Sequence, residues 1–145
     1  MVKQVVNATY TPIPHPAQSF RSFREFYPFY LGEHSRRPNR LFHLLGTSIA
    51  LACHTRVLLS LAPYVAGKLS LNVGPGAVDV LRRLALSRGD ALKIFFSGVI
   101  QGYFLAWLGH YQIEGNKPAT FKYPVFSFLG DLRMLWEVVT LQRSV

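Results

Sequence analysis

The sequence predicts an all-α protein, and its two long apolar segments are the main reason. In and around these segments, apolar residues recur every three or four positions, which is the spacing of one face of a helix. No segment alternates apolar and polar residues as a half-buried strand does, and no internal repeat stands out. We therefore expect a small membrane-associated helical bundle built on an apolar helical hairpin.

Composition and charge indicate a single lipid-contacting domain. The chain has 145 residues, of which 50% are hydrophobic and 16% charged, and this length suits one domain. We predict an extended leader over residues 1–18 and a single helical domain over residues 19–145. Cys53 is the only cysteine, which excludes an intrachain disulfide and a cysteine-rich metal site.

The net charge of +9 favours an anionic partner. A lipid headgroup, a fatty carboxylate or a nucleic acid would each satisfy it. Basic residues alternate with aromatic ones in residues 20–30, but no recognised nucleic-acid module accompanies them. We therefore expect membrane lipid as a partner and no nucleic acid.

Residues 19–34 are predicted to form an aromatic helix. Ser22 followed by Glu25 matches a capping box, and the spacing of the aromatic residues turns His34 inward. Proline lacks the backbone donor and restricts the residue before it, so we expect Pro28 to bend this helix and Pro38 to end it.

The hairpin is predicted over residues 41–67 and 91–112. The first segment is interrupted by His54 and Arg56. In the second, residues 94–109 carry no charge and would cover roughly 24 Å, which falls short of a hydrocarbon core of about 30 Å unless the helix extends at both ends. A buried core helix has the same hydropathy and remains an alternative. Asp90 stands where the N-cap of the second segment belongs.

Two shorter helices are expected outside the hairpin. Residues 77–86 can form a basic amphipathic helix, which would rest on a headgroup surface or pack on the domain. Asp131 can cap a final helix in which Arg133 and Glu137 pair. The spacing of Leu132 and Trp136 predicts that they dock this helix onto the hairpin.

Three histidines lie at the edges of the predicted elements: His34, His43 and His110. In an antiparallel hairpin, the start of one helix and the end of the other lie at one level, so His43 and His110 can meet there with His34. Glu114 follows His110 by four residues and would share its face of a helix. Imidazoles with a carboxylate and open coordination positions suit ferrous iron. A histidine at a helix end is also commonly a capping residue, so spacing leaves both interpretations open.

Other chemistries are disfavoured. The chain has no glycine-rich phosphate loop and no nucleophile elbow, which argues against nucleotide hydrolysis and acyl-serine chemistry. We expect His15 and His54 to be solvent or interface residues.

Two longer motifs resemble a known family. They are Phe26 to His34 with Asn39 to Thr47, and Gly102 to Pro124 with Gly130 to Met134. These stretches are similar to a family of small membrane proteins whose fungal members are 2-hydroxy fatty acid dioxygenases. The resemblance implies a protein of the endoplasmic reticulum, another intracellular membrane or a bacterial inner membrane. It also implies bound Fe2+ and the use of oxygen to shorten a 2-hydroxy fatty acid by one carbon with release of carbon dioxide.

The resemblance also suggests roles for individual residues. His34, His43 and His110 match the family pattern and take the role of metal ligands. Glu114, which its spacing places on the helix face of His110, would be a further ligand or a partner to a ligand histidine. Arg40, and less directly Arg37, could hold the substrate carboxylate through the fixed fork of donors of a guanidinium. Equally, both arginines could simply flank a membrane segment. Four residues could orient the imidazoles: Asn39, Glu114, Asn116 and Asp131.

Two non-catalytic functions are the alternatives. The chain could be an accessory subunit of a larger membrane complex, or a lipid-binding protein that uses the same pocket and basic rim. Lys and Arg are more numerous in the two terminal parts than between the apolar segments, which favours both termini facing the cytosol.

Overall fold

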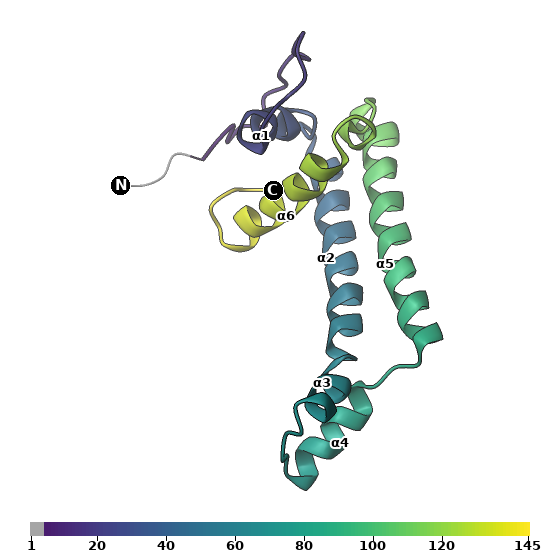
Figure 1. The fold of residues 1–145 in the computed structure, drawn as a ribbon. Coiled ribbons are helices and arrows are strands. Elements are labelled where there is room, and N and C mark those ends of the chain that lie inside the picture. Colours follow the sequence, from purple (N-terminus) through teal and green to yellow (C-terminus); the bar gives the residue numbers. More distant parts are fainter. Residues whose placement is uncertain (1–4) are drawn as a thin grey trace. The chain divides into compact units, whose positions relative to one another are not determined.

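The computed structural model describes residues 5–145, and within this range all regular structure is helical. The predicted all-α class is confirmed. Figure 1 shows the order of the elements. They are α1 (Phe23–Gly32), α2 (Arg37–Leu59), α3 (Ala62–Lys68), α4 (Pro75–Leu84), α5 (Arg88–Leu108), a π-helical turn η1 (Gly109–Glu114), a 3₁₀ turn η2 (Ala119–Phe121) and α6 (Pro124–Val139).

The chain divides into two compact units, so α2 and α5 each contribute to both. The first unit is Met1–Ser48 with Gly102–Val145, and the second is Ile49–Gln101. The single domain predicted over residues 19–145 stays a prediction. Of the predicted leader, residues 1–4 lie outside the described part, and residues 5–22 contain no helix or strand. Tyr10 from this segment is nevertheless buried in the core of the first unit.

Aromatic side chains of α1 form most of the core of the first unit. Five consecutive or nearly consecutive residues of α1 are buried together with Tyr10 and Met134: Phe26, Tyr27, Phe29, Tyr30 and Leu31. Burial of each large apolar side chain contributes about 1.5 to 3 kcal/mol. The predicted Ser22 cap is present, since the Ser22 hydroxyl accepts a hydrogen bond from the backbone N–H of Glu25 at 3.3 Å. Core packing and this cap together fix α1.

The boundaries around the first two helices differ from the prediction. Instead of reaching His34, α1 ends at Gly32, which leaves His34 in the turn before α2. Pro38 does not terminate α1 but lies in the first turn of α2. A proline is tolerated there because the first amide groups of a helix have no partner within it.

Two predicted caps are wrong. At α5 the cap is Ser87, whose hydroxyl accepts from the backbone N–H of Asp90 at 3.1 Å and donates to its carboxylate at 2.7 Å. Asp90 therefore occupies the first turn instead of the cap. Asp131 lies in the middle of α6, because that helix already begins at Pro124, a residue favoured at helix starts.

Buried polar side chains join α6 to α1 and to the chain ends. Glu137 accepts hydrogen bonds from the Tyr27 hydroxyl at 2.9 Å, from Arg143 at 2.7 Å and, as predicted, from Arg133 at 2.9 Å. Burial alone would raise the pKa of Glu137, but these three donors outweigh it and hold the pKa below its ordinary value. Arg143 also donates to backbone carbonyls of the N-terminal segment and so closes the first unit.

The predicted docking of Trp136 is wrong. Trp136 is 63% exposed. The inward stripe of α6 is instead Ser127, Gly130, Met134 and Glu137. At Gly130 an added Cβ atom would lie 2.8 to 2.9 Å from ring carbons of Tyr30. This close approach, together with the ion pairs of Glu137, turns the large apolar residues of α6 outward.

Helices α2 and α5 run antiparallel in each unit and form the predicted hairpin (Figure 1). In the first unit, an added Cβ at Gly46 would lie 3.1 Å from the carbonyl oxygen of Gly102. In the second unit, an added Cβ at Gly98 would lie 2.7 Å from the Cβ of Cys53. Small residues at such contacts let helix backbones approach closely, as they do in membrane helix pairs.

Two helical stretches, Arg37–Lys68 and Arg88–Glu114, are long and apolar enough to cross a membrane. Only 6% of the residues in the most apolar window of each are buried, unlike a core helix of a soluble protein. Length, composition and exposure thus support membrane association.

Replacement of Gly130 with alanine should destabilise the first unit. The added methyl group meets three ring carbons of the fully buried Tyr30, so we expect a loss of about 1 to 3 kcal/mol, typical of an overpacked core. Thermal unfolding in detergent, followed by circular dichroism, measures this loss. Gly76→Ala in α4 is the control, because nothing lies within 4 Å of its added Cβ. An unchanged midpoint for Gly130→Ala would show that Tyr30 does not pack this closely on Gly130.

Candidate metal centre

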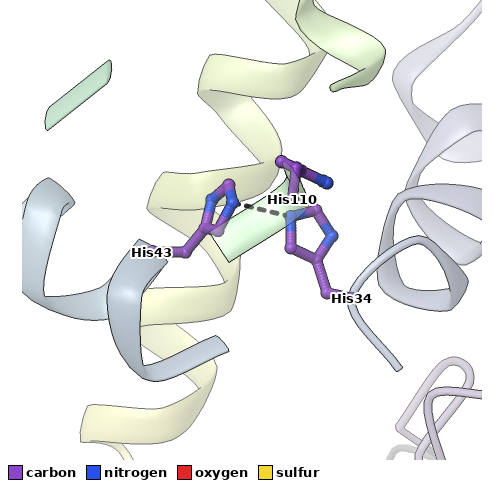
Figure 2. A group of neighbouring side chains, drawn as sticks. All are labelled: His34, His43 and His110. Atoms are coloured by element: carbon purple, nitrogen blue, oxygen red, sulfur yellow. Dashed lines mark hydrogen bonds between the residues drawn. The ribbon is translucent and has the colours of Figure 1, made fainter. Parts of the chain in front are cut away.

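Three buried histidines from separate segments meet in the first unit. His34 comes from the turn after α1, His43 from α2 and His110 from η1. Their ring centroids lie 4.2, 4.8 and 4.9 Å apart, and one nitrogen of each ring lies within 4.8 Å of the others. Figure 2 shows the three side chains close together, with a dashed line between His34 and His43. The structure thus brings together the three histidines that the sequence singled out.

Each ring is held through its Nδ1 atom by a different acceptor. His34 Nδ1 lies 2.6 Å from the carbonyl oxygen of Tyr30. His43 Nδ1 lies 2.7 Å from Asp131 Oδ1, and His110 Nδ1 lies 2.7 Å from Asn116 Oδ1. Such partners fix the orientation of metal-binding histidines.

These contacts determine where the ring hydrogens are. A carbonyl and a carboxylate only accept, so His34 and His43 donate from Nδ1. The amide nitrogen of Asn116 donates to the backbone oxygen and the carboxylate of Glu33, both at 3.1 Å, which turns its oxygen toward His110. His110 therefore also donates from Nδ1. In the neutral rings, all three Nε2 atoms carry free lone pairs.

The convergence of these lone pairs is compatible with a bound cation. Nε2 of His34 and Nε2 of His43 are 3.2 Å apart, and without a hydrogen between them they repel. Burial lowers the pKa of His34, and the neighbouring His43 and His110 lower it further, so this ring is neutral near pH 7. Neutral imidazole nitrogens are good ligands for divalent zinc, copper, nickel and iron. The donor set fits a transition metal held by three nitrogens, with further coordination positions left open.

Tyr30 supports two of the three histidines. Its backbone oxygen accepts from His34, and its hydroxyl donates at 2.5 Å to the same Asp131 oxygen that holds His43. Burial raises the pKa of Tyr30, and the Asp131 carboxylate raises it further, so the phenol keeps the hydrogen that it donates.

A π-helical turn presents His110. At Gly109 an added Cβ would clash with the side-chain oxygen of Asn39, so only glycine permits this contact. The turn ends at Gly115, which adopts a left-handed φ of 76° and donates its N–H to the carbonyl oxygen of His110 at 2.8 Å. In a π-helix the hydrogen bonds run to the fifth residue, which changes the angular offset between His110 and Glu114 from that of an α-helix.

The comparison with known families agrees with this geometry. The family described as 2-hydroxy-palmitic acid dioxygenase Mpo1-like matches residues 20–143 of the chain. The chain belongs to this family. The Mpo1-like match includes all three histidines and both apolar helices. No curated protein and no solved structure shows significant similarity to the chain.

In this Mpo1-like chain, Glu114 lies outside the histidine cluster as far as residues 5–145 describe it. Its carboxylate accepts hydrogen bonds from the backbone and hydroxyl of Ser35, the backbone of Arg36 at 3.2 Å and the amide of Asn39 at 3.0 Å. Because Ser35 and Arg36 directly follow His34, Glu114 fastens the turn that carries this histidine to η1. A catalytic role for Glu114 stays a prediction.

Arg40 also holds this turn. Its guanidinium donates to the carbonyl oxygens of His34 at 2.7 Å and Ser35 at 2.6 Å, and it stacks 3.7 Å from the centroid of the Tyr10 ring. Only 7% of the residue is exposed. The catalytic role predicted for Arg40 stays a prediction.

Two of the predicted orienting residues, Asn116 and Asp131, contact the rings, whereas Asn39 contacts Glu114. The sequence interpretation missed Tyr30 and Glu33. Tyr30 precedes His34 by four residues, a spacing at which a side chain can reach back to a carbonyl oxygen, so this contact carried a readable signal. Glu33 and Asn116 are 83 residues apart in the sequence, so no local pattern could have predicted their contact.

Asp131→Asn should weaken metal binding. The substitution keeps the shape of the side chain but replaces a charged acceptor by a neutral one at His43, so we expect affinity for Fe2+ to fall about 10- to 100-fold. Anaerobic titration of the purified protein against a chelator measures the change. Asp79→Asn is the control, because Asp79 is an exposed residue of α4. Equal affinity of the Asp131 variant and the parent would show that His43 does not need this carboxylate.

Proposed function

We propose that this Mpo1-like protein is a membrane-associated, Fe(II)-dependent dioxygenase that shortens 2-hydroxy fatty acids by one carbon. One observation carries the proposal. Three buried histidines direct their Nε2 lone pairs at one another, while Nδ1 of each is held by an acceptor. The family description adds the reaction class.

Iron is favoured over zinc because the reaction is a redox reaction. Zinc has no redox chemistry in proteins, whereas imidazole ligands with open positions suit ferrous iron. When bound, iron would supply the electron transfer that molecular oxygen needs in order to react with an organic acid.

The proposed conversion balances without a further reductant. One 2-hydroxy acid and one oxygen molecule give the acid shortened by one carbon, one carbon dioxide and one water. The bond between the carboxyl carbon and the hydroxyl-bearing carbon breaks. The hydroxyl-bearing carbon is oxidised to the new carboxyl group, and oxygen is reduced.

The protein side chains would position and shield this chemistry. Tyr30, Asp131 and Asn116 hold the rings, and burial of all three histidines limits access of water. A pocket of about 510 Å³ lies next to the cluster. One of its lining residues, Asn116, is also the residue that accepts the hydrogen bond from His110. Its walls combine aromatic rings with two lysines and one carboxylate: Phe29, Phe121, Tyr123, Lys117, Lys122 and Glu33.

This pocket is where we place the acid before reaction. The guanidinium of Arg40 is occupied by two backbone carbonyls, so Lys117 and Lys122 are better placed to attract a carboxylate. The aromatic walls would contact the first part of the acyl chain, and the rest would extend into lipid. The proposed location is the endoplasmic reticulum or another intracellular membrane, or the inner membrane in a bacterium, with a larger membrane complex as a possible setting.

Single substitution of each cluster histidine should abolish both iron binding and turnover. We expect His34→Ala, His43→Ala and His110→Ala to lose bound iron and oxygen-dependent consumption of 2-hydroxypalmitate, while helix content stays unchanged. Iron content after anaerobic purification and mass spectrometry of the shortened acid are the measurements. His54→Ala is the control, because His54 lies in α2 outside the cluster.

Two outcomes would contradict the proposal. If the parent protein binds no stoichiometric metal, the chain is a non-catalytic membrane or lipid-binding protein. If it binds iron but consumes no 2-hydroxy acid with oxygen, the metal centre is present and the reaction class is wrong.

A further inference from the structure

The outward face of α6 is apolar, whereas its inward face combines hydrogen-bonded carboxylates with Gly130 and the buried Met134. An apolar outward face is the reverse of a helix on a water-soluble domain. Inward lie Asp131 and Glu137, whose carboxylates accept hydrogen bonds from the Tyr30 and Tyr27 hydroxyls of α1. Outward lie four large side chains that are 59 to 68% exposed: Val125, Phe128, Trp136 and Val139. Exposure of such a contiguous face to water is unfavourable, and such faces mark surfaces that another phase or molecule covers.

This face continues the exposed surface of α5. The Trp107 ring of α5 stacks on Phe121 of η2, with ring centroids 5.8 Å apart and planes at 28°. Both rings are exposed, and so is Phe104, one turn earlier in α5. Because α5 belongs to a stretch that is long and apolar enough to cross a membrane, lipid around the end of α5 would also meet the exposed Phe121 ring of η2, which lies just before α6.

Length and charge specify how α6 contacts this medium. With 16 residues, α6 would cover about 24 Å, too short for a hydrocarbon core of about 30 Å. Its polar side is also fastened to α1 along much of its length, which excludes a lipid-surrounded span. Lys117 and Lys122 are exposed next to the start of the helix and suit anionic headgroups.

We propose that α6 lies in the plane of the membrane interface, with Val125, Phe128, Trp136 and Val139 inserted among the lipids. This inference rests on the membrane embedding of the hairpin in the proposed function. Because α6 also supplies Asp131 to His43, it would hold the metal centre at the membrane boundary, where a fatty acid can enter from the bilayer.

The two tryptophans of the chain, Trp107 and Trp136, allow a direct test. Trp107→Phe leaves Trp136 as the only tryptophan and Trp136→Phe leaves Trp107, so excitation at the long-wavelength edge, where tyrosine does not absorb, reports on one residue at a time. Each full-length variant is reconstituted into phosphatidylcholine and phosphatidylserine vesicles whose acyl chains carry bromine at a shallow or a deep position. We expect Trp136 to lose most of its emission to the shallow bromine, less to the deep one, and little to iodide in the water.

The Trp107 variant separates failure of this inference from failure of the proposed embedding. Quenching of Trp107 by brominated lipid, with Trp136 quenched only by iodide, would overturn the in-plane placement and leave the embedded hairpin intact. If both tryptophans escape the lipid quenchers, the hairpin is not embedded and the membrane part of the proposed function fails as well.

A second copy of the chain is the rival occupant of this face. Trp136 would then be shielded from both bromine and iodide, and a cysteine introduced at Val139 in the Cys53→Ser background would cross-link two chains. That result would overturn the lipid placement. Quenching by the shallow bromine without cross-linking would support it.

Discussion

The arrangement of the three-histidine cluster depends on how closely Tyr30 of α1 approaches Gly130 of α6. Only a residue without a side chain lets the ring come this near the backbone of α6. The ring position then places the phenol on Asp131, the next residue after Gly130, and Asp131 places His43. The backbone oxygen of the same tyrosine holds His34. One helix contact thereby sets two of three ligand orientations, and a shift of this contact would move both rings together.

Buried polar groups and exposed apolar groups on α6 have one common cause. Asp131 and Glu137 must both face α1, the first to hold His43 and the second to join Tyr27, Arg133 and Arg143. Burial of a carboxylate without partners is costly, so these bonds are obligatory once the side chains face inward. The opposite side of the helix, with Val125, Phe128, Trp136 and Val139, then faces outward, and under lipid these side chains can be apolar without penalty.

Sequence periodicity and spacing predicted the helical class, the antiparallel hairpin and the meeting of the three histidines. These features follow from local patterns and from the geometry of a hairpin. The exposure of Trp136 could not be predicted from the sequence. Apolar spacing shows which residues of α6 share a face, but not which face packs against the rest of the protein. The position of Glu114 could not be predicted either. The prediction that Glu114 shares a face with His110 assumed an α-helix, but Gly109 to Glu114 form a π-helical turn. Both features are set by contacts between distant segments.

The use of three different acceptors at Nδ1 has a chemical consequence. A carboxylate at His43 makes that ring the strongest electron donor, whereas a peptide carbonyl at His34 and a neutral amide at His110 leave those rings weaker donors. Three neutral ligands leave the charge of a divalent ion uncompensated at its coordination shell, except for the partial charge transmitted through His43. An anionic 2-hydroxycarboxylate would supply the missing negative charge. If the cluster binds iron as proposed, the absence of a carboxylate among its ligand atoms suits an acid better than a neutral alcohol or aldehyde as the substrate.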